Sequence, residues 1–119
     1  MSRILVADDD IKSCELLEGF FKMKWHDIIM AYSGMQALEI VMSENPDIAL
    51  LEIRMLERDG MEILKRMKES ARDIAIIMLA ALKDEKVAKG TLKAGADGYI
   101  TKPINFALLE SETLSRFMK

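Results

Sequence analysis

Short apolar runs alternate along this chain with longer stretches in which apolar residues recur at every third or fourth position. The runs are bounded by polar or turn residues, which is typical of buried strands. The predicted strands cover residues 3–7, 27–31, 47–51, 74–79 and 99–101. The stretches between them have the periodicity of amphipathic helices. The five helices are expected to begin near Ile11, Ser33, Gly60, Asp84 and Asn105.

Strands that alternate with helices at this spacing predict right-handed βαβ units and a parallel sheet. The run 74–79 is apolar throughout, so that strand is expected to be buried on both faces. Ser33 and Asn105 are suitable N-caps for the helices that follow them. The fold class is therefore α/β, as one domain over residues 1–119 with no effector domain in the chain.

Composition narrows the functional class. Half of the 119 residues are hydrophobic and 31% are charged, with only two prolines, so a folded domain with a substantial core is expected. The net charge is −3 and the basic residues are scattered, which argues against a nucleic-acid interface. A single cysteine, Cys14, excludes an internal disulfide and suits a reducing compartment. With no signal peptide and no apolar run long enough for a membrane, we expect a cytoplasmic protein.

The candidate chemistry lies at the predicted carboxyl ends of strands. Asp8 and Asp9 follow the first strand, Glu52 ends the third, and Lys102 follows the fifth. Adjacent acids in a loop are commonly turn or helix-start residues. In a parallel sheet, however, these ends meet at one edge, where ligands bind. Carboxylates suit Mg²⁺, and an ammonium group can neutralise a phosphoryl oxygen.

Five motifs occur in a specific order. They are Ile4-Leu-Val-Ala-Asp-Asp-Asp10, Pro46-Asp-Ile-Ala-Leu-Leu-Glu-Ile-Arg-Met55, Asp59-Gly60, Ile76-Ile-Met-Leu79 and Ala94-Gly-Ala-Asp-Gly-Tyr-Ile-Thr-Lys-Pro103. With them, the chain resembles receiver domains of two-component response regulators over essentially its whole length. The resemblance implies a flavodoxin-like (βα)5 doubly wound sheet of order 2-1-3-4-5. It also implies phosphoryl transfer from a histidine kinase to an aspartate on the third strand.

The resemblance assigns roles to individual residues of the acidic edge. Asp8 and Asp9 match the acidic pair that holds Mg²⁺, with Asp9 as the more direct ligand. Glu52 stands at the phosphoacceptor position, and the backbone carbonyl of Arg54 matches the main-chain metal ligand. Lys102 matches the lysine that contacts the phosphoryl group. The residues also allow an alternative to metal binding, in which the acids are solvated or paired with Lys102.

Two further residues take roles from the family. Tyr99 matches the aromatic residue whose ring moves on activation, although an ordinary strand tyrosine would look the same. The resemblance also implies a cis peptide bond before Pro103. The face made by the fourth helix, fifth strand and fifth helix is implied to change on activation. Three apolar residues of the last helix would add a contact patch for a homodimer or partner on that face: Leu108, Leu114 and Met118.

Three positions depart from the family pattern, all expected on loops around the same site. Glu52 replaces the phosphoacceptor aspartate, Ala80 replaces the switch threonine or serine, and Leu56 replaces a proline. The glutamate carries its carboxylate about 1.5 Å further out. Efficient phosphorylation is therefore not expected, and the hypothesis is a non-enzymatic signalling module that acts through protein contacts.

Other functions are compatible with some of these features. An orthodox Mg²⁺-dependent receiver could use Glu52 as a slow acceptor or mimic. A Mg²⁺-dependent phosphatase or phosphotransferase would require a substrate cap or a phosphate loop, and neither is visible. A nucleotide or flavin site is disfavoured because the loop after the first strand is acidic rather than glycine-rich. The expected partner is a histidine kinase or another signalling protein, with no role for nucleic acid or membrane.

Overall fold

One parallel sheet of five strands organises the protein, in the order β2-β1-β3-β4-β5. The structure is a computed structural model that describes residues 3–56, 60–70 and 73–112. The strands are β1 (Arg3–Ala7), β2 (Asp27–Ala31), β3 (Ile48–Glu52), β4 (Ala75–Ala80) and β5 (Gly98–Thr101). The helices are α1 (Ile11–Met23), α2 (Gly34–Glu44), α3 (Gly60–Ser70), α4 (Glu85–Lys93) and α5 (Phe106–Glu112), with 3-10 turns η1 (Ile53–Leu56) and η2 (Leu82–Asp84). The flavodoxin-like doubly wound order predicted for the sheet is confirmed.

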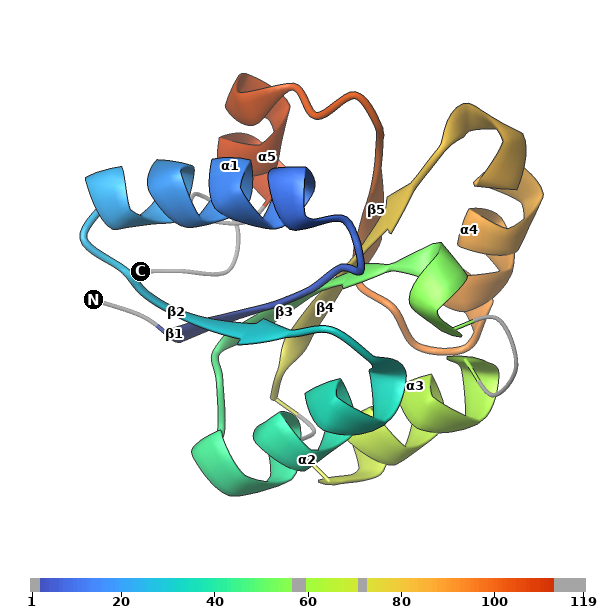
Figure 1. Ribbon diagram of the computed structural model, residues 1–119. Coiled ribbons are helices and arrows are strands. Elements are labelled where there is room, and N and C mark those ends of the chain that lie inside the picture. The colour runs from blue at the N-terminus through green and yellow to red at the C-terminus, as the bar shows by residue number, and fades with distance from the viewer. Residues whose placement is uncertain (1–2, 57–59, 71–72, 113–119) are drawn as a thin grey trace.

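Two separate cores cover the two faces of the sheet, because successive strand residues point to opposite sides. Helices α1 and α5 lie on one face, and α2 and α3 lie on the other (Figure 1). On the first side, Ile4 and Val6 of β1 pack with Leu17 and Phe21 of α1. On the second side, a larger cluster joins strand residues such as Leu51 to α2, α3 and Ala88 of α4. The central strands are therefore apolar on both faces, as expected for a parallel sheet.

Side-chain caps fix the starts of several helices. The Ser33 hydroxyl accepts a hydrogen bond from the backbone N–H of Gln36. The Asn105 side chain accepts bonds from the N–H groups of Ala107 and Leu108. Both predicted caps are thus confirmed. Asp10, the last residue of the acidic run, caps α1 in the same way through the N–H of Lys12.

Two strands extend one residue further towards the site than the sequence indicated. Both β3 and β4 begin and end one position later, so Glu52 and Ala80 are the last residues of their strands. Glu52 pairs with Leu79, and Ala80 pairs with Thr101. The expectation that these two residues lie on loops was wrong, because backbone pairing continues past the point where the apolar run stops. Their side chains are consequently held by the sheet rather than by a loop.

Several expected features fall outside the described residues. Asp59 of the Asp59-Gly60 turn lies there, as do Leu114 and Met118 of the proposed contact patch. Leu56 ends η1, but its side chain is not among those described. Within the described ranges, no helix has the length and apolar character needed to cross a membrane.

Candidate functional site at the carboxyl edge of the sheet

The carboxyl edge of the sheet gathers three acids from two neighbouring strands. Asp8 and Asp9 follow β1, and Glu52 closes β3, which pairs directly with β1. One carboxylate oxygen from each of the three lies within 4.8 Å of the others. Asp8 and Glu52 are buried, whereas Asp9 is exposed. The structure therefore brings together the acids that the sequence placed at one edge.

Asp8 is fully buried, and both of its carboxylate oxygens and its carbonyl accept hydrogen bonds. Its Oδ2 atom accepts a hydrogen bond from the Lys102 ammonium at 2.8 Å, which is a close ion pair. Its Oδ1 atom accepts the backbone N–H of Asp10 at 2.9 Å, and its carbonyl accepts the Cys14 thiol at 3.3 Å. Lys102 thus approaches the site as the sequence suggested, and the structure shows its ammonium paired with Asp8.

Glu52 has a cationic neighbour that sequence reasoning missed. The Nε atom of Arg54 lies 3.5 Å from Oε1 of Glu52, whose side chain is only 2% exposed. The Arg54 side chain is half exposed. The sequence assigned a role only to the Arg54 backbone. The direction of its side chain depends on the 3-10 turn η1, which the pattern of residues did not predict.

Burial and the neighbouring cations have opposite effects on the pKa of the Glu52 carboxyl. Burial raises the pKa of its carboxyl, while the backbone N–H of Arg54 and the charge of Lys102 lower that pKa. In return, the Glu52 carboxylate raises the pKa of the Arg54 guanidinium, with smaller contributions in the same direction from Asp9 and Asp84. Removing a carboxylate from water disfavours its charged form, which explains the first effect. Among the described residues, the site is therefore a compact set of acids with two neighbouring cations, the partly buried Lys102 and the half-exposed Arg54.

The donor set fits a hard divalent cation such as Mg²⁺. Mg–O distances are about 2.0–2.1 Å, so adjacent ligand oxygens lie about 3 Å apart and opposite ones about 4 Å apart. Oxygens within 4.8 Å of one another reach that range after a small side-chain adjustment. Asp8, Asp9, Glu52 and the Arg54 carbonyl would hold the ion, which would supply charge neutralisation at this edge. Lys102 and Arg54 already supply part of that neutralisation.

The remaining family positions lie around this cluster. Ala80 offers no hydroxyl, and its carbonyl accepts the backbone N–H of Lys102 at 2.7 Å. The Lys102–Pro103 peptide bond is cis. Tyr99 is partly buried and packs against the core on the α2, α3 and α4 side. Cys14 is buried and its pKa is raised to about 11, chiefly by desolvation, so it is an inert thiol.

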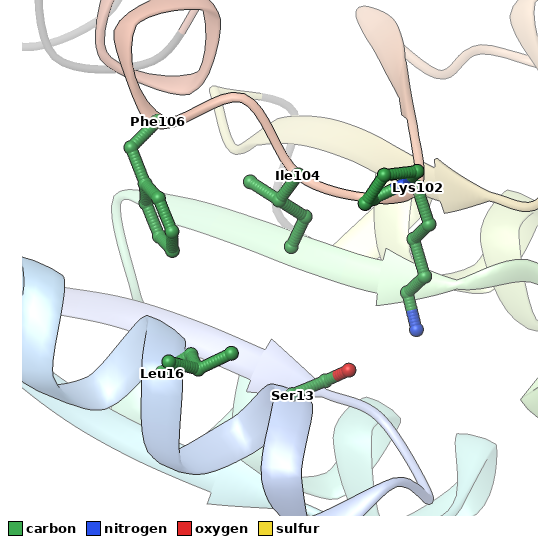
Figure 2. Close-up of a pocket in the computed structure, with 6 residues that line it drawn as sticks. Ser13, Leu16, Lys102, Ile104 and Phe106 are labelled. Carbon is green, nitrogen blue, oxygen red and sulfur yellow. The ribbon is translucent and has the colours of Figure 1, made fainter.

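A shallow, mainly apolar pocket adjoins the acidic edge. It has a volume of about 220 Å³ and lies between α1 and the segment that leads from β5 to α5. Figure 2 shows Leu16 of α1 facing Ile104 and Phe106 across it, with Lys102 and Ser13 towards the acidic edge. Lys102 therefore borders both the pocket and the carboxylate cluster.

Comparison with known proteins agrees with this geometry. The family model for the response regulator receiver domain matches residues 4–113. The transcriptional regulatory protein ZraR of Salmonella typhimurium is 37% identical over 113 residues, which cover 95% of this chain and 25% of that protein. The Escherichia coli protein of the same name is 36% identical over 108 residues. The chain thus spans about a quarter of the length of these curated relatives.

Solved structures show the same fold. A two-component response regulator from Clostridium difficile has a TM-score of 0.87 at 26% identity, covering 97% of this chain and 94% of that one. A receiver domain protein from Clostridium thermocellum has a TM-score of 0.88 at 25% identity, covering 99% and 94%. The family match extends over nearly the whole chain and both cores. This chain therefore belongs to the response regulator receiver domain family of two-component signalling.

Proposed function

We propose that this receiver domain signals through protein contacts without phosphorylation of Glu52. The proposal rests on the burial and the ion pairing of the Glu52 carboxylate. It is buried, fixed at the end of β3 and paired with Arg54. A phosphoacceptor must present an oxygen in line with an incoming phosphoryl group. A buried, ion-paired and longer side chain is poorly suited to that task.

The magnitude of the positional effect supports this view. Misplacement of a reacting atom by about 1 Å can cost on the order of 10²-fold in rate. Glutamate displaces its oxygens by about 1.5 Å relative to aspartate. Before a cation binds, the Arg54 Nε atom also lies 3.5 Å from the carboxylate that would have to attack. The displacement of the carboxylate oxygens is therefore the main effect that slows phosphoryl transfer to Glu52.

Ala80 weakens the response that would follow phosphorylation. A side-chain hydroxyl at this position could bond a phosphoryl oxygen, and alanine cannot. A hydrogen bond to a charged group contributes about 1.5–3 kcal/mol. A ligand shifts a conformational equilibrium only through such differential contacts. Without the hydroxyl, a phosphoryl group on Glu52 would have one contact fewer with which to move the β4–α4 segment.

The direct test is intact-mass measurement after incubation with acetyl phosphate and Mg²⁺. The unchanged chain is expected to gain no phosphoryl group. Glu52→Asp and the double variant Glu52→Asp, Ala80→Thr serve as matched controls, and we expect the double variant to gain one group. A stable phosphoryl group mapped to Glu52 of the unchanged chain would overturn the proposal.

A slow phosphoacceptor is the second candidate. Asp8, Asp9 and Lys102 keep the arrangement that such chemistry requires, with Lys102 only 2.8 Å from Asp8. Extended incubation distinguishes the two functions. A slow acceptor accumulates phosphoryl groups on Glu52 with time, and this gain disappears in Glu52→Gln.

The proposed partners follow from the family and from exposed apolar residues. Receiver domains exchange signals with histidine kinases and other signalling proteins, and they are not in general enzymes. Val87 and Leu92 of α4 and Leu108 of α5 are exposed in the structure. We propose the face of α4, β5 and α5 as the surface for a homodimer or a signalling partner. A cytoplasmic location is proposed from the family membership alone.

A further inference from the structure

Arg54 occupies an unusual electrostatic position. Its Nε atom is 3.5 Å from Glu52, and the charges of Asp9 and Asp84 also act on its guanidinium. Half of its side chain remains exposed, so the group has room to move. A guanidinium carries five N–H donors in a planar fork and can serve more than one carboxylate. Arg54 is thus a half-exposed cation among several acids.

Asp84 offers the second acceptor. It closes η2 immediately before α4, and its backbone N–H donates to the carbonyl of Ala81 at 2.9 Å. Its side chain makes no capping bond to α4. Its Oδ2 atom is buried and has no hydrogen-bond partner in the part of the chain that the structure describes. Buried polar atoms are nearly always satisfied in native proteins, so this oxygen requires an explanation.

We propose that Arg54 is a movable counter-ion that neutralises Glu52 until a divalent cation displaces it towards the unsatisfied oxygen of Asp84. A cation bound to Glu52 would share that carboxylate with a positive guanidinium, and the two positive charges repel each other. The Arg54 guanidinium then moves from Glu52 to Asp84, immediately before α4. Metal binding at the sheet edge is thereby coupled to the position of α4.

This inference deepens the proposed function and rests on it in one respect, because it takes Glu52 to be an unmodified carboxylate. It supplies α4 with an input that requires neither phosphoryl transfer nor a hydroxyl at position 80. The two proposals fail separately. Phosphorylation of Glu52 is measured by intact mass. The role of Arg54 as a counter-ion is measured by the affinity for the metal ion in the absence of any phosphoryl donor.

The first experiment is a calorimetric titration with Mn²⁺ or Mg²⁺. Arg54→Met is expected to bind the cation about fivefold more tightly than the unchanged chain, because the competing cation is gone. Arg66→Met, which removes the same charge from the exposed surface of α3, is the matched control and should not change the affinity. Arg54→Gln provides a second variant if the methionine variant folds poorly. Equal affinity in the Arg54 variants and the unchanged chain, or no binding by either, would overturn the inference.

The second experiment tests the role of Asp84. Asp84→Asn should weaken cation binding about twofold in the unchanged chain and have no effect in the Arg54→Met background. Hydrogen exchange of the α4 amides should respond to Mn²⁺ in the unchanged chain alone. An equal effect of Asp84→Asn in both backgrounds would show that Asp84 does not receive Arg54, and would overturn that part of the proposal.

Discussion

The two edges of the sheet each contain a lysine–aspartate ion pair, and the two pairs differ in the charges that surround them. At the amino edge, the Lys68 ammonium binds Asp97 at 2.9 Å and the carbonyl of Ile74 at 2.8 Å. The same Asp97 oxygen accepts the backbone N–H of Ile76. This arrangement joins α3, β4 and the α4–β5 turn. Its charges are matched one to one, as is typical of a structural contact.

At the carboxyl edge, the pair of Lys102 and Asp8 is surrounded by further acids. Asp9 and Glu52 lie beside it, and Arg54 is a second cation near them in the part of the chain that the structure describes. Among the described residues, three acids meet two cations here, so we expect an added cation to lower the free energy of the folded state. The same two residue types thus form an isolated ion pair at one edge and part of a larger acidic cluster at the other.

Lys102→Met is expected to have the largest effect on stability. It leaves the fully buried Asp8 beside two other acids, and removal of one partner from a buried pair costs about 3–5 kcal/mol. Urea unfolding at neutral pH measures the loss. Addition of Mg²⁺ should recover part of it, because the ion can neutralise the same acids. A loss that Mg²⁺ does not reduce would contradict the distinction between the two edges.

Asp97→Ala is expected to cause the next largest loss of stability. It leaves Lys68 and the N–H of Ile76 without this acceptor, at a cost of about 2 kcal/mol. Here Mg²⁺ should not restore stability, because among the described residues this contact contains one acid and one cation. Asp73→Ala, which removes an exposed aspartate close in sequence to β4, is the control and should change stability by less than about 0.5 kcal/mol. Rescue of Asp97→Ala by Mg²⁺ would show that the amino edge also binds cations.

Glu52→Gln is expected to increase stability at neutral pH by about 1 kcal/mol, a common size for a single substitution. The pKa of Glu52 is raised in the folded state, so the folded protein binds a proton more tightly than the unfolded chain does. The charged glutamate therefore destabilises the fold above its raised pKa, and this cost fades as pH falls towards the ordinary glutamate pKa. Thermal unfolding across this pH range should show the two proteins converging at acidic pH. A constant difference at every pH would rule out ionisation as its cause.

Val87→Glu should have the smallest effect on stability, below about 0.5 kcal/mol, because Val87 is exposed on α4. Its effect should appear in self-association, since a charge on an apolar contact surface opposes pairing. Sedimentation velocity over a range of concentrations measures this change, with Met42→Glu on the exposed surface of α2 as the control. Unchanged sedimentation of a self-associating chain would remove the α4 face from the proposed interface.

Much of the fold followed from the sequence because its signals are local. The ranges of β1 and β2 match the prediction residue for residue, since each apolar run is bounded by charged or turn residues. The caps at Ser33 and Asn105 depend only on the next few residues. The ends of β3 and β4 were misplaced by one residue, because strand pairing there outlasts the apolar pattern.

The sequence predicted which residues form the site, but it did not predict all of the contacts between their charged groups. The acids at positions 8, 9 and 52 and the lysine at 102 converge because parallel strands deliver their ends to one edge. Which cation meets which acid depends on side-chain directions that no periodicity encodes. The 3-10 turn after β3 directs Arg54 towards Glu52, and the register of β5 directs Lys102 towards Asp8. The unsatisfied oxygen of Asp84 could likewise be found only in three dimensions.

The single cysteine has a practical consequence for measuring α4. Cys14 is buried, donates its thiol to the carbonyl of Asp8, and has a pKa of about 11, so thiol reagents at neutral pH should leave it unmodified. A cysteine introduced on the exposed surface of α4, as in Val87→Cys, would then be the one site available for a spin label or fluorophore. Changes in the surroundings of α4 upon addition of Mn²⁺ or a partner could therefore be followed with one label, and the natural cysteine would not have to be replaced.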